Sequence, residues 1–93
     1  MAFATRTVEI VNERGLHARA AAKFTALAET FACDISVSNG RETVPGRSIM
    51  GLLLLAAAKE SEIVITASGS DATEAMEALC DLVGRGFDEE PAP

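Results

Sequence analysis

The spacing of apolar residues along the chain predicts four β-strands. Apolar and polar positions alternate over residues 5–11 and 33–38, as they do in strands that bury one face, and residues 62–67 are predicted to form another strand. Asn39-Gly40 is a strong hairpin signal and predicts a short further strand over residues 41–44. The side chains expected to face inward from the first two strands are Val8, Ile10, Cys33, Ile35 and Val37.

Between the strands the apolar spacing changes to three and four residues, which predicts helices. The first helix covers residues 18 to 30 or 31, and its apolar face consists of Ala20, Phe24, Leu27, Ala28 and Phe31. Ser48 is a suitable N-cap for a short helix over residues 49–55. A capping-box sequence at Asp71 starts a last helix, which a glycine ends soon after residue 83.

The resulting order of elements is β-α-β-β-α-β-α. Strands with one apolar face and amphipathic helices predict an α+β fold, a two-layer, open-faced β-sandwich. In this fold three helices cover one face of a four-stranded antiparallel sheet. We expect one domain over residues 1–88 and a disordered tail over residues 89–93.

Composition and charge narrow the possible functions. The chain has 93 residues, is 48% hydrophobic and carries a net charge of −6. Nucleic-acid binding is not expected, because no large basic surface is available. The charge is uneven, however, since Arg14, Arg19 and Lys23 lie in a segment without an acidic residue. This segment contains the only histidine, His17, and favours a local anion site.

The sequence predicts a cytoplasmic protein that does not enter a membrane. Its longest apolar run has ten residues, over 49–58, whereas a spanning helix needs about 20. The N-terminus lacks the pattern of a signal peptide. Cys33 and Cys80 match no zinc or CxxC spacing and are interpreted as small core residues, with a disulfide disfavoured in the cytosol.

His17 lies at the start of the first predicted helix. The first amide N–H groups of a helix lack intrahelical partners and, together with the helix dipole, attract anions such as phosphate. The same positive field disfavours an imidazolium, so a neutral ring offers one nitrogen lone pair as a nucleophile. A phosphoryl group on that nitrogen would lie among the helix amides, within reach of the Arg19 guanidinium.

Position alone leaves other interpretations of this segment open. His17 could be a surface or capping residue, and Arg19 with Lys23 could form a solvated helix face. A metal site is not expected, because Glu13 is the only nearby candidate ligand. A hydrolytic triad is not expected either, since nothing local supplies both a nucleophile and an orienting acid.

The segment GLHARAAAKF, residues 15–24, resembles the active-site pattern GLHARPAA of a known family. This family is HPr, the histidine-containing phosphocarrier protein of the phosphoenolpyruvate-dependent phosphotransferase system. The resemblance covers about residues 7–87 and implies an HPr-like fold, phosphorylation of His17 on its δ nitrogen and assistance from Arg19. The closing RGFDEE resembles the end of nitrogen-related members of the family.

A second segment, GRSIMGLLLLA at residues 46–56, is similar to the regulatory-serine segment of the same family. The resemblance implies that Ser48 is a target of the HPr kinase/phosphorylase. It also implies a partner-docking surface made of Leu16, Ile49, Met50 and Leu53. From the residues alone, Ser48 is explained as a plain N-cap, a role that is compatible with regulation.

Two positions depart from the family pattern. Ala20 replaces a proline in the first helical turn, which leaves the rigidity of the His17 loop open. Glu60 follows Lys59 where many members have glycine, so we expect a different local turn there.

The resemblance implies a monomeric phosphocarrier that needs no metal or cofactor and is not an enzyme with its own turnover. Phosphate would come from phosphoenolpyruvate through an enzyme I-type kinase, rest on His17 and pass to an enzyme IIA-type acceptor, as in sugar transport. Two alternatives remain open. One is a regulatory binding module of a nitrogen-type phosphotransferase system without sugar transport, and the other is a small-molecule sensor on a similar sandwich.

Overall fold

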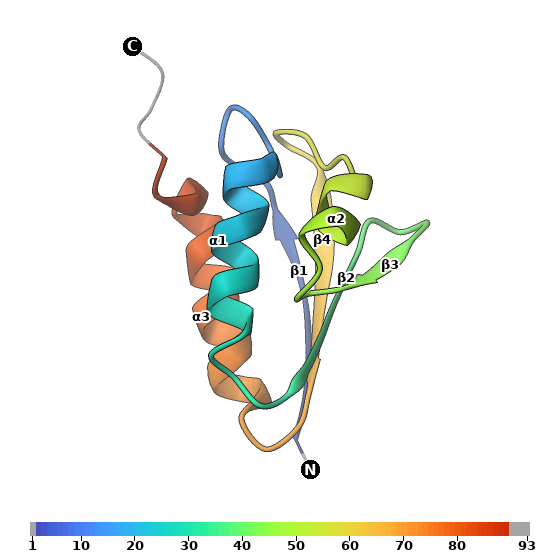
Figure 1. Cartoon of the computed structure of the whole chain (residues 1–93), viewed down its shortest axis with the longest axis vertical. Helices are drawn as coiled ribbons and strands as arrows, with labels where there is room; N and C mark the ends of the chain where they lie inside the picture. The colour runs from blue at the N-terminus through green and yellow to red at the C-terminus, as the bar shows by residue number, and fades with distance from the viewer. Residues whose placement is uncertain (1, 90–93) are drawn as a thin grey trace.

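A four-stranded antiparallel sheet forms one layer of the protein (Figure 1). The computed structural model describes residues 2–89. The strands lie in the order β1-β4-β2-β3, and their bounds are Phe3–Glu9 for β1, Asp34–Ser38 for β2, Thr43–Pro45 for β3 and Glu62–Ser68 for β4. In the register Thr5 lies opposite Thr66, and Val37 lies opposite Ile65.

The helices form the second layer and cover one face of the sheet (Figure 1). They are α1 (Ala18–Ala28), α2 (Ile49–Leu54) and α3 (Ala72–Gly84), and the 3₁₀ turn η1 (Gly86–Asp88) follows α3. α1 packs against both of the other helices, and α3 packs against β1 and β4. The predicted open-faced sandwich and its order of elements are therefore confirmed.

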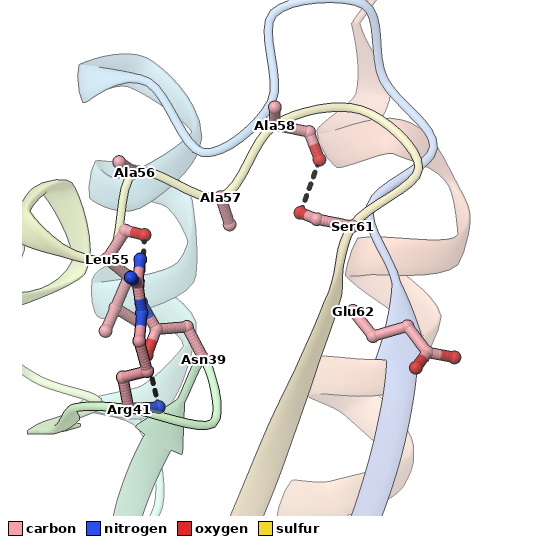
Figure 2. Close-up of a pocket in the computed structure, with 8 residues that line it drawn as sticks. All are labelled: Asn39, Arg41, Leu55, Ala56, Ala57, Ala58, Ser61 and Glu62. Atoms are coloured by element: carbon pink, nitrogen blue, oxygen red, sulfur yellow. Dashed lines mark hydrogen bonds between the residues drawn. The ribbon is translucent and has the colours of Figure 1, made fainter.

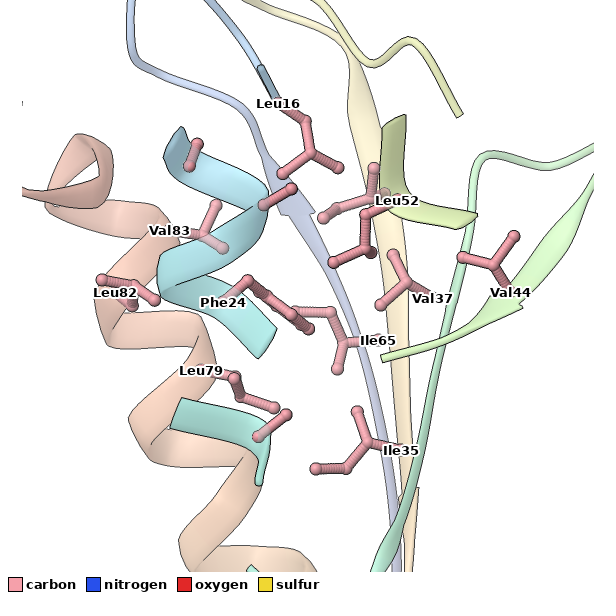
Figure 3. Close-up of a cluster of buried hydrophobic side chains, with 14 of the residues drawn as sticks. Leu16, Phe24, Ile35, Val37, Val44, Leu52, Ile65, Leu79, Leu82 and Val83 are labelled. Atoms are coloured by element: carbon pink, nitrogen blue, oxygen red, sulfur yellow. The ribbon is translucent and has the colours of Figure 1, made fainter. Parts of the chain in front are cut away.

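The core lies between the sheet and the two long helices. Phe24 of α1 is fully buried and lies next to Ile65 of β4, and Leu79 of α3 points into the same layer (Figure 3). The inward positions predicted for β2 are also confirmed, because Cys33, Ile35 and Val37 are at most 5% exposed. Burying a large apolar side chain contributes about 1.5–3 kcal/mol, so this interface determines which face the helices cover.

The hairpin after β2 is longer than predicted. Ser38 lies opposite Thr43, so four residues connect the two strands and β3 starts at Thr43 rather than at residue 41. The Asn39 side chain explains the difference, because its Oδ1 accepts the backbone N–H groups of Arg41 and Glu42 at 3.0 and 2.8 Å. In a two-residue hairpin these two N–H groups would belong to the following strand, but here the Asn39 side chain binds them.

The N-cap at Asp71 also differs from the prediction. Asp71 occupies the N-cap position of α3, but its carboxylate makes no capping bond. It instead accepts the backbone N–H groups of Ala32 and Cys33, at 2.8 and 2.9 Å, where the chain enters β2. The side chain therefore connects α3 to β2, and the predicted capping box does not form.

The boundaries of two other elements are earlier than predicted. β1 ends at Glu9, although the N–H of Ile10 still donates to the Ser61 carbonyl at 2.8 Å. α1 ends at Ala28, near which the Arg47 guanidinium donates to the carbonyls of Ala28, Phe31 and Cys33. Of the predicted tail, residues 90–93 lie outside the described residues, and Glu89 lies inside them.

The two cysteines, Cys33 and Cys80, are both free thiols. Burial is the main cause that raises the pKa of each, and the Asp71 carboxylate raises that of Cys33 further.

Over residues 2–89 no helix is long and apolar enough to cross a bilayer.

Candidate functional site

Gly15 determines how the chain approaches His17. Its φ is +65°, which favours glycine, and a Cβ here would collide with the carbonyl oxygen of Ala57 and lie 2.9 Å from the Cα of Ala58. The next residue, Leu16, donates its N–H to the Ala57 carbonyl at 2.9 Å. The glycine therefore lets the loop pack directly against the connection between α2 and β4.

The same connection borders a hollow of about 230 Å³ (Figure 2). There Nδ2 of Asn39 donates to the Leu55 carbonyl at 3.2 Å. The lining residues are Asn39, Arg41, Leu55, Ala56, Ala57, Ala58, Ser61 and Glu62. His17 is not one of them, so the hollow is separate from the histidine.

His17 is the N-cap residue of α1, as the sequence predicts. Its backbone is extended, and its carbonyl accepts the N–H of Ala21 at 2.8 Å. The ring turns back onto the helix, where Nδ1 accepts the backbone N–H of Arg19 at 3.3 Å. Because an accepting ring nitrogen carries no proton, this hydrogen bond assigns the ring proton to Nε2. The Nδ1 lone pair therefore faces the amide end of α1.

The other ring nitrogen contacts a residue from the opposite end of the sequence. Nε2 donates to Oε2 of Glu89, 72 residues later. Oε1 of the same carboxylate accepts from Nδ2 of Asn12 at 2.8 Å. Nδ2 of Asn12 also donates to the Gly15 carbonyl at 2.7 Å. His17, Asn12 and Glu89 thus form one hydrogen-bonded group, the His17 cluster.

Glu89 is ionised within this cluster. Burial acts to raise the pKa of its carboxyl, but the hydrogen bonds from Asn12 and His17, with the nearby Arg14 guanidinium, outweigh burial and keep the pKa below its usual range. A carboxylate can only accept hydrogen bonds. An accepting Glu89 carboxylate agrees with a proton on Nε2 of His17 and an unprotonated Nδ1.

The two basic residues of α1 have different surroundings. Lys23 is half-buried, and its Nζ donates to the Phe87 carbonyl at 2.7 Å, which connects η1 to α1. Arg19 is exposed, and only its backbone N–H contacts the ring of His17. Among the described residues the Lys23 ammonium therefore has a hydrogen-bond partner, whereas no bond of the Arg19 guanidinium is found.

Ser48 is the N-cap of α2, and its Oγ accepts the N–H of Gly51 at 2.9 Å. Beyond it, Ile49 is 40% exposed and Met50 69%, whereas Leu53 is partly buried. Leu54 is also 69% exposed, although it was not among the expected docking residues. These side chains form an apolar surface on α2, toward the same end of the molecule as the start of α1 (Figure 1).

Leu16 does not belong to this surface. It is only 4% exposed, and its side chain points into the core (Figure 3). The expectation that Leu16 forms part of a docking surface is therefore wrong. The same close approach that requires Gly15 brings the next side chain inward.

Two members of the His17 cluster were not found from the sequence. Asn12 was interpreted only as a turn residue, and Glu89 was assigned to the tail. Neither position has a local signal, because their contact with His17 depends on how α3 and η1 return toward the start of α1. Over residues 2–89, no group of three His, Cys, Asp or Glu side chains is arranged to bind a metal ion.

The fold and the histidine at the helix start both agree with a match to a protein-family model. The model describes the PTS HPr component phosphorylation site and matches residues 4–85. The chain belongs to the HPr family. The general role of a phosphocarrier in the phosphotransferase system belongs to this family.

Relatives from both branches of the HPr family are similar to the chain. Phosphocarrier protein HPr of Neisseria meningitidis is 46% identical over 84 residues, which cover 90% of this chain and 94% of that protein. Phosphocarrier protein NPr of Shewanella violacea is 40% identical over 84 residues, which cover 90% of this chain and 92% of that protein. The crystal structure of HPr-C-His from Thermoanaerobacter tengcongensis has a TM-score of 0.89 at 39% identity and covers 94% of this chain and 98% of that one.

Proposed function

We propose that this HPr accepts a phosphoryl group on Nδ1 of His17 from a phosphorylated enzyme I-type protein and passes it to an enzyme IIA-type protein in the cytoplasm. The observation that supports this most directly is the unprotonated Nδ1 at the N-terminus of α1, whose lone pair accepts only the long hydrogen bond from the Arg19 N–H among the bonds of the described residues. The family implies the two partners. In this proposal the carrier acts as a monomer.

The proposed transfer is a simple displacement at phosphorus. The Nδ1 lone pair forms the new N–P bond, while the bond between phosphorus and the donor atom breaks and its electrons stay on the donor. The incoming phosphorus replaces the long bond from the Arg19 N–H, which is then free to donate to a phosphoryl oxygen. The Arg19 guanidinium stabilises the charge of the transferring group. The second transfer, to the acceptor, is the same step with this chain as donor.

The apolar surface on α2 is the proposed docking site for both partners. Its exposed members Ile49 and Met50 keep the role implied by the family, partly buried Leu53 contributes an edge, and Leu54 is added. An apolar patch on a small protein is typical of an interaction site. Ser48 lies at the start of this surface, so a phosphate added there by an HPr kinase/phosphorylase would place about two negative charges where partners dock.

The test is the intact mass of the protein after incubation with phosphoenolpyruvate and an active enzyme I-type kinase. We expect one added phosphoryl group that is labile in acid. The same reaction with His17→Ala should give none, because no other histidine is present. Wild-type protein that stays unmodified beside a kinase shown to be active would contradict the proposal.

A regulatory role in a nitrogen-type system is the second candidate, favoured by the similarity to NPr proteins. The two roles differ in the acceptor. Phosphorylated protein should transfer its group to a sugar-specific IIA protein if it serves transport. Transfer only to a nitrogen-type IIA protein would favour the regulatory role.

A further inference from the structure

We propose that Glu89 is a positioning residue for His17, which fixes the orientation of the ring and the nitrogen that carries the proton. The inference rests on the proposed function, because it matters for transfer only if His17 is the phosphoryl acceptor. It adds a residue from the C-terminal end of the chain to a site that the sequence places wholly in residues 15–24.

The segment that carries Glu89 is attached to the rest of the protein at several points. Phe87 is fully buried although its φ is +57°, a conformation that is costly for a residue with a Cβ. Its carbonyl accepts Nζ of Lys23 at 2.7 Å. One residue on, Asp88 accepts a hydrogen bond from Nε of Arg85 at 2.8 Å, a local bond that does not connect the segment to α1. The burial of Phe87 and the bond from Lys23 place Glu89 against the start of α1.

The carboxylate of Glu89 is itself oriented by Asn12. Both groups around Nδ2 of Asn12, the Gly15 carbonyl and Oε1 of Glu89, are acceptors, so the amide must present its nitrogen to them. With Oε1 occupied in this way, Oε2 is left to accept from Nε2 of His17. The ring is therefore bonded on both sides, to Arg19 at Nδ1 and to Glu89 at Nε2.

This arrangement has a consequence for phosphoryl transfer. When the Nδ1 lone pair forms the bond to phosphorus, the ring keeps its proton on Nε2 and gains positive charge. A carboxylate next to Nε2 stabilises that charge as it develops, without gaining or losing a proton. The same oriented pair of carboxylate and imidazole is used where an acid orients a histidine base.

The first measurement is the NMR signature of His17 in the unphosphorylated protein. In wild type we expect Nδ1 to show the ¹⁵N shift of an unprotonated nitrogen, and the Nε2 proton to exchange with water slowly enough to be observed. Glu89→Ala should lose the Nε2 proton signal through fast exchange. Asp88→Asn is the matched control, since it removes an acid one residue away that contacts Arg85 and not His17.

The second measurement is the rate of phosphoryl transfer from the enzyme I-type protein. We expect Glu89→Ala to lower kcat about 10- to 100-fold, the range for one lost hydrogen bond to a charged group. KM should stay unchanged, because Glu89 lies outside the apolar surface on α2. Glu89→Gln should also be slow, since it keeps the size of the side chain but removes the charge. Unchanged melting temperatures show that the variants are folded.

Two results would overturn the proposal. One is a Glu89→Ala protein with the wild-type Nε2 proton signal and the wild-type rate. The other is an Asp88→Asn protein with the same loss of signal and rate, since the effect would then come from the segment and not from the carboxylate. Failure of wild type to accept phosphate would contradict the proposed function alone, because the NMR signature does not depend on transfer.

Discussion

Glu60 illustrates at the residue scale how a single backbone position can store strain. Its φ is +76°, in the left-handed region, and its N–H donates to the Ile10 carbonyl at 2.7 Å. The bond fixes the turn between the α2 connection and β4, so the side chain has to tolerate the conformation. Glu60 thus adopts a left-handed conformation that glycine would adopt with less strain.

Glu60→Gly should therefore make the protein more stable. The left-handed conformation destabilises the folded state by about 1–2 kcal/mol for a residue with a Cβ. Glycine removes this cost, but the greater freedom of its unfolded chain offsets roughly 0.5–1 kcal/mol of the gain. We expect a net rise of up to about 1 kcal/mol in the free energy of unfolding, measured in urea. Glu60→Ala keeps the Cβ and removes the charge. If it stabilised the protein as much as glycine does, strain would not be the cause.

At the scale of elements, two side chains join the ends of the helices to the sheet. Asp71 at the start of α3 accepts two N–H groups at the entry to β2, and Arg47 donates to carbonyls at the end of α1 and beyond. The first of these bonds, from the Ala32 N–H, is the largest cause of the lowered pKa of the Asp71 carboxyl. The connection therefore depends on the carboxylate form.

The lowered pKa of Asp71 predicts how the free energy of unfolding depends on pH. Because it is lower in the folded than in the unfolded protein, ionised Asp71 stabilises the fold above its usual value of 3.8, and this contribution is lost as the pH falls through the folded value. Asp71→Asn should lower the free energy of unfolding at neutral pH and flatten its decline in acid. Glu74→Gln, in the first turn of the same helix, is the control. Equal acid profiles for wild type and Asp71→Asn would contradict this explanation.

At the scale of the whole molecule, Ser48 connects stability with the proposed docking of partners. It is the N-cap of α2 and also borders the apolar surface on that helix. A negative group at a helix N-terminus is favourable for the helix. If partners dock on the apolar surface as proposed, we expect the same charge, on a protein whose net charge is already −6, to weaken their binding.

Ser48→Asp should consequently separate the two effects. We expect the melting temperature to stay near that of wild type, because aspartate is a good N-cap. The Kd for the enzyme I-type protein should rise several-fold, and the rise should shrink at high salt, where exposed charges are screened. Ser48→Ala should instead lower the stability by about 0.5–2 kcal/mol, because it removes the N-cap, and leave the Kd unchanged. A Ser48→Asp protein that unfolds easily but docks normally would argue against an electrostatic effect.

The sequence by itself determined the order of the elements and the faces that they bury. Periods of two and of three to four residues report burial directly, so Val37 and Phe24 were placed correctly without knowledge of their partners. The motif around His17 also determined the helix start, because Gly15 and the N-cap act within a few residues of each other. Such features follow from local backbone geometry.

Only the tertiary structure decided which groups complete the site. The Asp71 carboxylate bonds at the entry to β2 instead of capping its own helix, because the backbone at Gly69 closely approaches Cys33. Leu16 is in the core because Gly15 brings the loop against the connection after α2. Glu89 contacts His17 across 72 residues because η1 is anchored to α1. Contacts between distant segments depend on how the whole chain packs, and no local pattern records them.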